Sequence, residues 1–171
     1  MEADGGILLR AWLLAVTGVP EIIFAHQDGD RPALPYGLLN LTGQGPIRRP
    51  SEHEYTSDVP ENNMGTEIPV MEWRWNWSFN IFGGVETQSA MRGVIVAKES
   101  ATTLESLSPY VIFGTSDVRD LTEIVDNRHE PRAQIDIDLR AELRDGVSIN
   151  VIEDATTSFP DGAVNVVVTQ A

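Results

Sequence analysis

The chain has no cysteine among its 171 residues. This absence excludes disulfide bonds, thiolate metal sites and cysteine nucleophiles, and it fits assembly in a reducing cytoplasm. Histidine is scarce too, and the three that occur do not have the spacing of a metal-binding motif such as HxxxH. The GxSxG, P-loop and GxGxxG patterns are also missing. The sequence therefore carries no signature of a common enzyme class.

Positive charge is also in short supply. The chain has 26 acidic residues against 12 basic ones, which gives a formal net charge of −14, and Lys98 is its one lysine. Proteins that bind nucleic acid by neutralising phosphates need the opposite balance. An acidic surface would let DNA pass nearby without sticking, but solubility explains the charge more simply.

The apolar run at residues 7–16 raises the question of export or membrane insertion. The residues before it carry acids and no base, and Arg10 interrupts it. A signal peptide needs a positive leader, and a membrane span needs roughly twenty apolar residues. We therefore predict a buried helix over residues 7–17, capped by Asp4 and closed by Gly18. Because the run is apolar nearly all round, this helix should pack on both a sheet and a neighbour.

Two long segments alternate apolar and polar residues with a period of two, the pattern of a strand with one buried face. The apolar face of residues 71–81 contains three tryptophans, and we expect it to be core rather than an aromatic binding platform. The apolar face of residues 133–143 is aliphatic. The two faces consist of Met71, Trp73, Trp75, Trp77, Phe79 and Ile81, and of Ala133, Ile135, Ile137, Leu139, Ala141 and Leu143.

Weaker signals complete the order of predicted elements. A second helix is expected at residues 85–99, followed by a short turn with Thr102 and Glu105 as a capping box. The turn at residues 145–146 should join the 133–143 strand to the next strand in a hairpin. This order predicts an α+β fold, with a mostly antiparallel sheet packed by two helices on one face. The remaining strands are predicted at residues 21–26, 36–42, 110–113 and 147–152.

Two segments stand apart from these elements. Residues 43–68 are polar, contain three prolines and have almost no apolar periodicity. An irregular loop of this length is uncommon without a function, so we predict a long loop or an arm laid on another subunit. Residues 155–171 form a polar extension that ends in VNVVV, which can add as a strand to a neighbouring sheet. We accordingly assign a domain to residues 1–154 and an extended C-terminal arm to residues 155–171.

The polar face of the 133–143 strand holds Asp136, Asp138 and Glu142. Clustered carboxylates can hold magnesium for phosphoryl chemistry. Arg140 and Arg144 interleave with them on the same face, however, and compete as partners. We therefore favour a solvated or intersubunit charged face over a metal site, and we predict neither catalytic nor metal-binding residues.

Charges of alternating sign also gather around the turn before this strand. Arginine is the base best suited to bidentate carboxylate pairing at interfaces. Exposed pairs within one chain, by contrast, stabilise a fold little. The residues alone leave both interpretations open. The candidates for a subunit interface are Arg119, Asp126, Arg128, Glu130, Arg132, Asp136, Asp138 and Arg140.

Three segments carry a resemblance to a known family. They are Ala11-Trp12 with Thr17-Gly18, then IIFAHQDGDRPALPYGLLNLT at residues 22–42, and VRDLTEIVDNRHEPRAQIDIDLRAEL at residues 118–143. These segments resemble the neck or tail terminator proteins of long-tailed bacteriophages, also called tail completion proteins. The resemblance covers most of residues 7–143. RPALPY and EPRAQIDI are its most specific pieces, and neither is a catalytic motif.

The resemblance implies a structural protein of the virion with no activity and no cofactor. Such proteins form a ring, usually of six subunits, that stops growth of the tail tube and joins the tube to the head–tail connector. The implied partners are other copies of the chain, the tail tube protein, the connector protein and, in a contractile tail, the sheath protein. DNA would pass through the lumen without specific binding, and no membrane is involved. The protein would be made in the host cytoplasm and located in the neck, at the top of the tail.

Two other functions stay open at this point. A head-completion or connector protein of the neck could have a similar small α+β fold. A metal-dependent enzyme that uses Asp136, Asp138 and Glu142 is the third and least favoured possibility.

Overall fold

The computed structural model describes residues 2–26, 30–47, 52–56, 64–84, 86–125, 128–144 and 147–150. The chain divides into two compact units. The first unit is Met1–Ile47 with Glu72–Glu142, and the second is Arg48–Met71 with Leu143–Ala171. The C-terminal extension predicted at residues 155–171 lies outside the described residues.

Among its described residues, the first unit contains three helices and most of the strands. The long strand β4 (Met64–Phe82) contributes residues to both units. The other elements of the first unit are α1 (Glu2–Thr17), β1 (Ile22–Phe24), β2 (Tyr36–Pro46), α2 (Thr87–Ala97), α3 (Ala101–Leu107), β5 (Val111–Thr115), β6 (Arg119–Asp120), β7 (Glu123–Val125), β8 (Arg128–Glu130) and, as far as Glu142, β9 (Arg132–Arg144).

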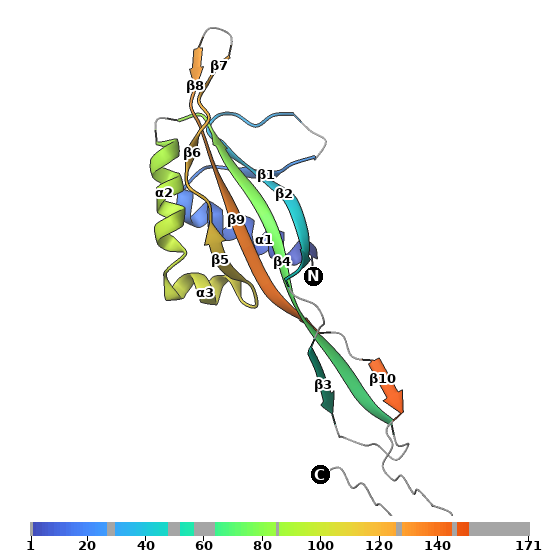
Figure 1. Cartoon of the computed structure of the whole chain (residues 1–171). Coiled ribbons are helices and arrows are strands. Elements are labelled where there is room, and N and C mark those ends of the chain that lie inside the picture. The colour runs from blue at the N-terminus through green and yellow to red at the C-terminus, as the bar shows by residue number, and fades with distance from the viewer. Residues whose placement is uncertain are drawn as a thin grey trace, which may run out of the picture. The chain divides into compact units, whose positions relative to one another are not determined.

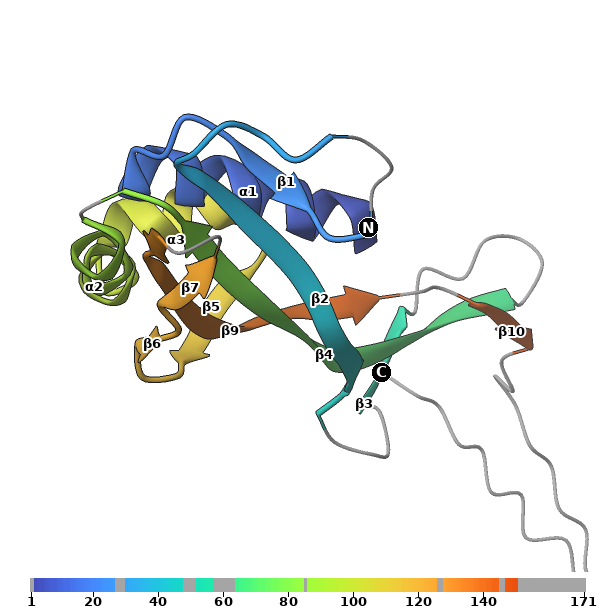
Figure 2. The same ribbon diagram turned by 90° about the horizontal axis from the view of Figure 1, so that it is seen from above.

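The sheet of the first unit has the strand order β1-β2-β4-β9-β5, and β6 also pairs with β9. β1 runs parallel to β2, whereas the β2–β4, β5–β9 and β6–β9 pairs are antiparallel. All three helices lie on one side of this sheet (Figure 1, Figure 2). The predicted α+β class with a mostly antiparallel sheet is thus confirmed, and α3 is added to the two expected helices.

The core lies between the helices and the central strands β4 and β9. The predicted apolar faces are confirmed from Trp75 to Ile81 and from Ala133 to Leu139, whereas Trp73 and Ala141 at their far ends are only half-buried. Trp75, Trp77, Phe79 and Ile81 of β4 are 1–6 % exposed or fully buried. The helices supply the opposite wall of this core, because a sheet face of this kind must be covered by another element. The other main core residues are Leu9, Trp12 and Leu13 of α1, Met91 and Val94 of α2, Leu107 of α3, and Ala133, Ile135, Ile137 and Leu139 of β9.

Helix α1 begins earlier than predicted. It starts at Glu2, so Asp4 lies within the helix and is not its N-cap. Gly5 and Gly6 disfavour helix by about 1 kcal/mol each. They are buried, however, because the chain here approaches two aromatic rings: a Cβ at Gly5 would lie 2.9 Å from Tyr110, and one at Gly6 would lie 2.9 Å from Trp77. Close packing therefore overrides helix propensity. Gly18 ends the helix as predicted, with a φ of +67°.

The buried tryptophans differ in how their indole N–H groups are satisfied. Trp12 Nε1 donates to Thr103 Oγ1 at 3.1 Å, which joins α1 to α3. Trp75 Nε1 and Trp77 Nε1 are buried and meet no acceptor among the described residues. An unsatisfied buried donor costs about 1–3 kcal/mol. These two rings therefore stabilise the fold through the burial of their apolar area, and the unsatisfied N–H groups offset part of that stabilisation.

Three local predictions were wrong. The N-cap of α3 is Ser100, and Thr102 lies inside the helix, so the capping box of Thr102 and Glu105 does not form. The strand β10 (Val147–Asn150) pairs with β4 rather than forming a hairpin with β9. Residues 43–68 are not an irregular loop throughout. β2 continues to Pro46, β3 (Glu52–Thr56) lies within the segment, and β4 begins at Met64.

The second unit, in its described part, consists of strands. β3 and β10 both pair antiparallel with the N-terminal part of β4. The proposed contact of this segment with another subunit stays a prediction.

The two glycines of α1 give a test of the packing argument. Gly6→Ala should lower the free energy of unfolding by about 1 kcal/mol or more, because overpacking against a rigid, buried indole typically costs 1–3 kcal/mol and outweighs the gain in helix propensity. Gly93→Ala is the matched control. It lies in α2, and a Cβ added there would have nothing within 4 Å, so it should raise stability by up to about 1 kcal/mol. Urea unfolding of both variants would measure this, and equal shifts in the same direction would refute the close-packing account.

Candidate functional site

The sheet face opposite the helices, called here the outer face, carries paired charges. Arg119 of β6 forms an ion pair with Asp136 of β9. Two residues further along β9, Arg140 Nη2 lies 2.7 Å from Asp138 Oδ2. All four residues were predicted as interface candidates, and the structure brings them together in one charged ladder. Their side chains are between 23 % and 48 % exposed, so the ladder is open to solvent or a partner.

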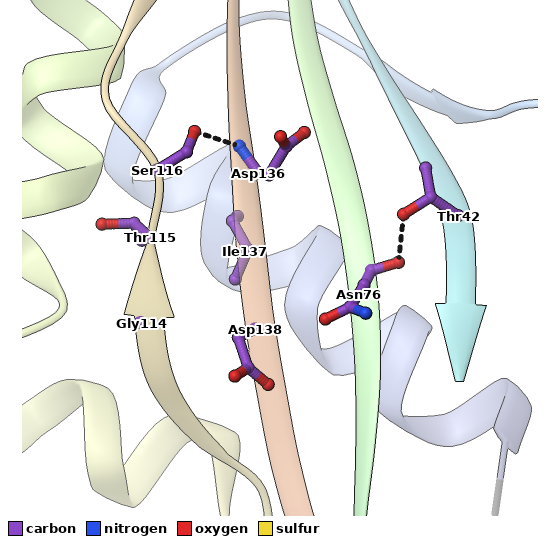
Figure 3. Close-up of a pocket in the computed structure, with 8 residues that line it drawn as sticks. All are labelled: Thr42, Asn76, Gly114, Thr115, Ser116, Asp136, Ile137 and Asp138. Carbon is purple, nitrogen blue, oxygen red and sulfur yellow. Dashed lines mark hydrogen bonds between the residues drawn. The ribbon is translucent and has the colours of Figure 1, made fainter. Parts of the chain in front are cut away.

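A groove crosses the outer face beside this ladder (Figure 3). Both of its flanking strands have a β-bulge or irregularity at this level, between Leu41 and Gly43 in β2 and between Ile112 and Gly114 in β5. Such bulges bend a strand and redirect its side chains. The groove is lined by Thr42, Asn76, Gly114, Thr115, Ser116, Asp136, Ile137 and Asp138.

Two hydrogen bonds fix the walls of the groove. Ser116 Oγ accepts from the backbone N–H of Asp136 at 2.9 Å, which ties the segment after β5 to β9. Thr42 Oγ1 donates to the carbonyl oxygen of Asn76 at 3.0 Å, which ties β2 to β4. Figure 3 draws both bonds. The groove is therefore a feature of the sheet itself, with walls held by the neighbouring strands.

Further along β4, the outer face is buried, which the polar pattern of this strand did not predict. Ser78 and Asn80 are each only 5 % exposed. Gln134 Nε2 donates to Ser78 Oγ at 2.8 Å, and Arg132 Nη2 donates to Asn80 Oδ1 at 3.1 Å. These bonds satisfy groups that would be costly to bury alone. They also link the two central strands on the side away from the apolar core.

Next to these bonds, two arginines share one aromatic ring. The guanidinium carbon of Arg132 lies 4.8 Å from the ring centre of Phe82, and that of Arg31 lies 5.5 Å from the same centre. Tyr36 stacks on Phe82 with centroids 5.0 Å apart, and its hydroxyl accepts from Arg31 Nε at 2.9 Å. Cation–π contacts contribute about 0.5–2 kcal/mol each. We call Arg31, Tyr36, Phe82 and Arg132 the arginine clamp.

The two arginines of the clamp form ion pairs with the hairpin formed by β7 and β8. This hairpin is a separate two-stranded sheet, and such a pair is marginally stable by itself. Arg31 forms an ion pair with Glu130 of β8, and Arg132 Nη1 lies 3.6 Å from Glu123 of β7. One arginine thus holds each strand. The hydrogen bond to Glu130 raises the pKa of the Arg31 guanidinium, which favours the charged form of this arginine.

Asp120 secures the base of the same hairpin. Its Oδ1 accepts from the hydroxyl of Thr122 at 2.6 Å and from the backbone N–H of Thr122 at 3.0 Å. Its Oδ2 accepts from Gln88 Nε2 of α2 at 2.8 Å. The bonds from Thr122 lower the pKa of Asp120, which keeps the carboxylate ionised.

The predicted interface candidates therefore fall into two groups. Arg119, Asp136, Asp138 and Arg140 form the ladder. Glu130 lies in the β7–β8 hairpin, and Arg132 belongs to the arginine clamp that holds it. Arg128 lies in β8, and Asp126 lies outside the described residues. Arg31, Tyr36 and Phe82 were missed, although RPALPY was singled out as a motif. Periodicity gives no signal for a contact between Arg31 and Glu130, which are 99 residues apart.

The described carboxylates do not form a metal site. No group of three or more potential ligands comes together in the part of the chain that the structure describes. Asp136 and Asp138 face arginines instead. None of the described helices is both long and apolar enough to cross a membrane.

Comparison with known families agrees with the resemblance. A family model described as "Phage neck terminator protein" matches residues 7–163. The chain belongs to the phage neck terminator family. A search of curated proteins found no match. Neck terminators are structural proteins of the virion that associate with other tail and neck proteins.

The two most specific motifs of this neck terminator meet in the arginine clamp. RPALPY supplies Arg31 and Tyr36, and EPRAQIDI supplies Glu130 and Arg132. Leu34 of the first motif also lies over Gly83, where a Cβ would come within 2.8 Å of it. The motifs therefore build a scaffold for the β7–β8 hairpin, which fits a protein that positions surfaces.

We expect Phe82→Leu to loosen the hairpin, because it removes the ring shared by both guanidinium groups. Amide exchange of the hairpin residues should accelerate several-fold, corresponding to about 1 kcal/mol of lost cation–π stabilisation. Hydrogen exchange with mass spectrometry would measure this.

Phe113→Leu is the matched control, because the ring of Phe113 lies under one arginine, Arg140, with 3.3 Å from the guanidinium carbon to the ring centre. This change should leave the hairpin peptides at their original rate. Unchanged exchange of the hairpin in Phe82→Leu would show that the clamp does not hold it.

Proposed function

We propose that this protein forms the ring that ends the tail tube and joins the tail to the head connector. Membership of the neck terminator family supports a position in the neck. The ring, its six-subunit size and the individual partners go beyond that membership. The proposed partners are other copies of the chain, the tail tube protein, the connector protein and, in a contractile tail, the sheath protein.

The observation that carries the proposal is the part of the outer face that bears the charged ladder and the groove, where the side chains of the ladder are partly exposed. The helices cover the other face, so the charged ladder and groove are available for contacts with another protein (Figure 1, Figure 3). Ordered charges of both signs set register and exclude wrong partners more than they add affinity. A subunit that must dock in one orientation between different neighbours needs such a surface. We assign Arg119, Asp136, Asp138 and Arg140 to these contacts.

The charge of the chain supports the same function. DNA must pass the neck of a phage without adhering to it, and a net charge of −14 disfavours adhesion to phosphates. Specific binding of DNA is therefore not part of the proposal.

Deletion of the gene tests the function directly. Phage that lack this protein should make tails of abnormal length that fail to join heads, while the heads themselves fill normally. Electron microscopy of the lysate would show both classes of particle. Joined particles with tails of normal length would rule the function out.

A point substitution tests the outer face separately from the fold. Nothing lies within 4 Å of a Cβ placed on Gly114, so Gly114→Trp should fold normally and fill the groove. We expect at least a tenfold loss of joined particles when this variant complements the deletion. Gly93→Trp is the control, since Gly93 has equal space but lies in α2, on the helical side. Equal complementation by the two variants would contradict a role for the groove.

A further inference from the structure

The β7–β8 hairpin exposes a large apolar side chain. Ile124 is 68 % exposed, although it lies in a short strand held at both sides by arginines. The neighbouring Glu123 is 65 % exposed in its side chain. The hairpin supplies no residue to the described core. Its ion pairs therefore hold an exposed apolar group in a fixed place, which lowers the entropy cost of a contact made through it.

A second apolar patch lies on β5. Phe113 is 65 % exposed and Val111 is 44 % exposed. Arg140 lies over the ring of Phe113. The Nε and Nη2 atoms of Arg140 donate hydrogen bonds to the carboxylate of Asp138. Exposed aromatic rings and arginines are the residue types that dominate binding energy at protein interfaces. We call Val111 and Phe113 the β5 patch.

The hairpin and the β5 patch do not meet within one subunit. The hairpin directly precedes β9 at Arg132, whereas the patch pairs with β9 around Asp138 to Arg140. Asp138 lies six residue steps along β9 from Arg132, which is roughly 20 Å at about 3.3 Å per step. Figure 1 shows the hairpin beyond the N-terminal end of β9, whereas β5 lies alongside the middle of β9. The same chain thus presents two apolar surfaces at separate places, one on the β7–β8 hairpin and one on β5 of the main sheet.

We propose that Ile124 of one copy docks on the β5 patch of a second copy. This inference rests on the proposed ring function and names the contact that builds it. Two different surfaces of one chain that meet between copies make a heterologous contact, which is the kind that closes a ring. The adjacent charges are complementary, with Glu123 beside Ile124 and Arg140 over Phe113, although each also has a partner within its own chain. A second copy is the proposed occupant, because it presents an apolar surface together with a charge opposite to the one beside Ile124.

Two substitutions break the contact from opposite sides. Ile124→Asp and Phe113→Asp each place a charge in the docked apolar surface, and each should abolish self-assembly measured by mass photometry, alone and with purified tail tubes. Ile7→Asp is the control, because Ile7 is an isoleucine of similar exposure, 55 %, on α1. It should assemble as the unaltered chain does. All three side chains are exposed, so thermal melts should stay close to that of the unaltered chain.

Mixing the two defective variants identifies the occupant. The Phe113→Asp chain keeps an intact hairpin, and the Ile124→Asp chain keeps an intact patch. Together they should form a dimer and nothing larger, because one working contact remains and the other is blocked.

Three results would overturn the inference, and they have different consequences for the proposed function. Rings that form despite either substitution would rule out this contact and would leave the proposed function unaffected. Two defective variants that stay monomeric when mixed would show that the occupant is another protein. An unaltered chain that never self-associates, with or without tail tubes, would remove the ring itself.

Discussion

The pairing of β4 with β9 at the centre of the sheet is the constraint from which the rest of the structure follows. Each strand alternates apolar and polar residues, and together they merge their apolar sides into one dry surface. Three helices cover that surface. Where these strands cross the first unit, the same alternation places their polar side chains on the opposite face. A single pattern therefore fixes both the core and the surface on which contacts with other proteins are proposed.

Polar interactions run along β9 on the outer face. They are buried near the start of the strand and become more exposed further along it. Near its start, Arg132 and Gln134 satisfy the buried Asn80 and Ser78. Further along, Asp136 and Asp138 face arginines in half-exposed pairs. The buried bonds fix the strands relative to each other, because an unsatisfied polar group there would be costly. The exposed pairs contribute little stability, which leaves their charges available to select a partner.

The arginine clamp shows how side chains from distant segments build a precise local geometry. Phe82 ends β4 and presents its ring to guanidinium groups from two distant segments. Those groups hold a hairpin that would be marginal alone. Positioning of this kind is what a structural protein of a phage neck requires, since its work consists of contacts made in one orientation. The motifs that resemble the family are thus explained by architecture.

The sequence by itself determined the two central strands, their buried faces, the α+β class and the candidates on the polar side of β9. These features follow from the period of two and need no knowledge of distant partners. Tertiary structure alone decided the start of α1, where close approach to Tyr110 and Trp77 outweighs the low helix propensity of Gly5 and Gly6. It also decided that β10 pairs with β4 and that Arg31 meets Glu130. The physical reason is the same in each case: these outcomes depend on contacts between segments far apart in the chain, and local patterns hold no information about such contacts.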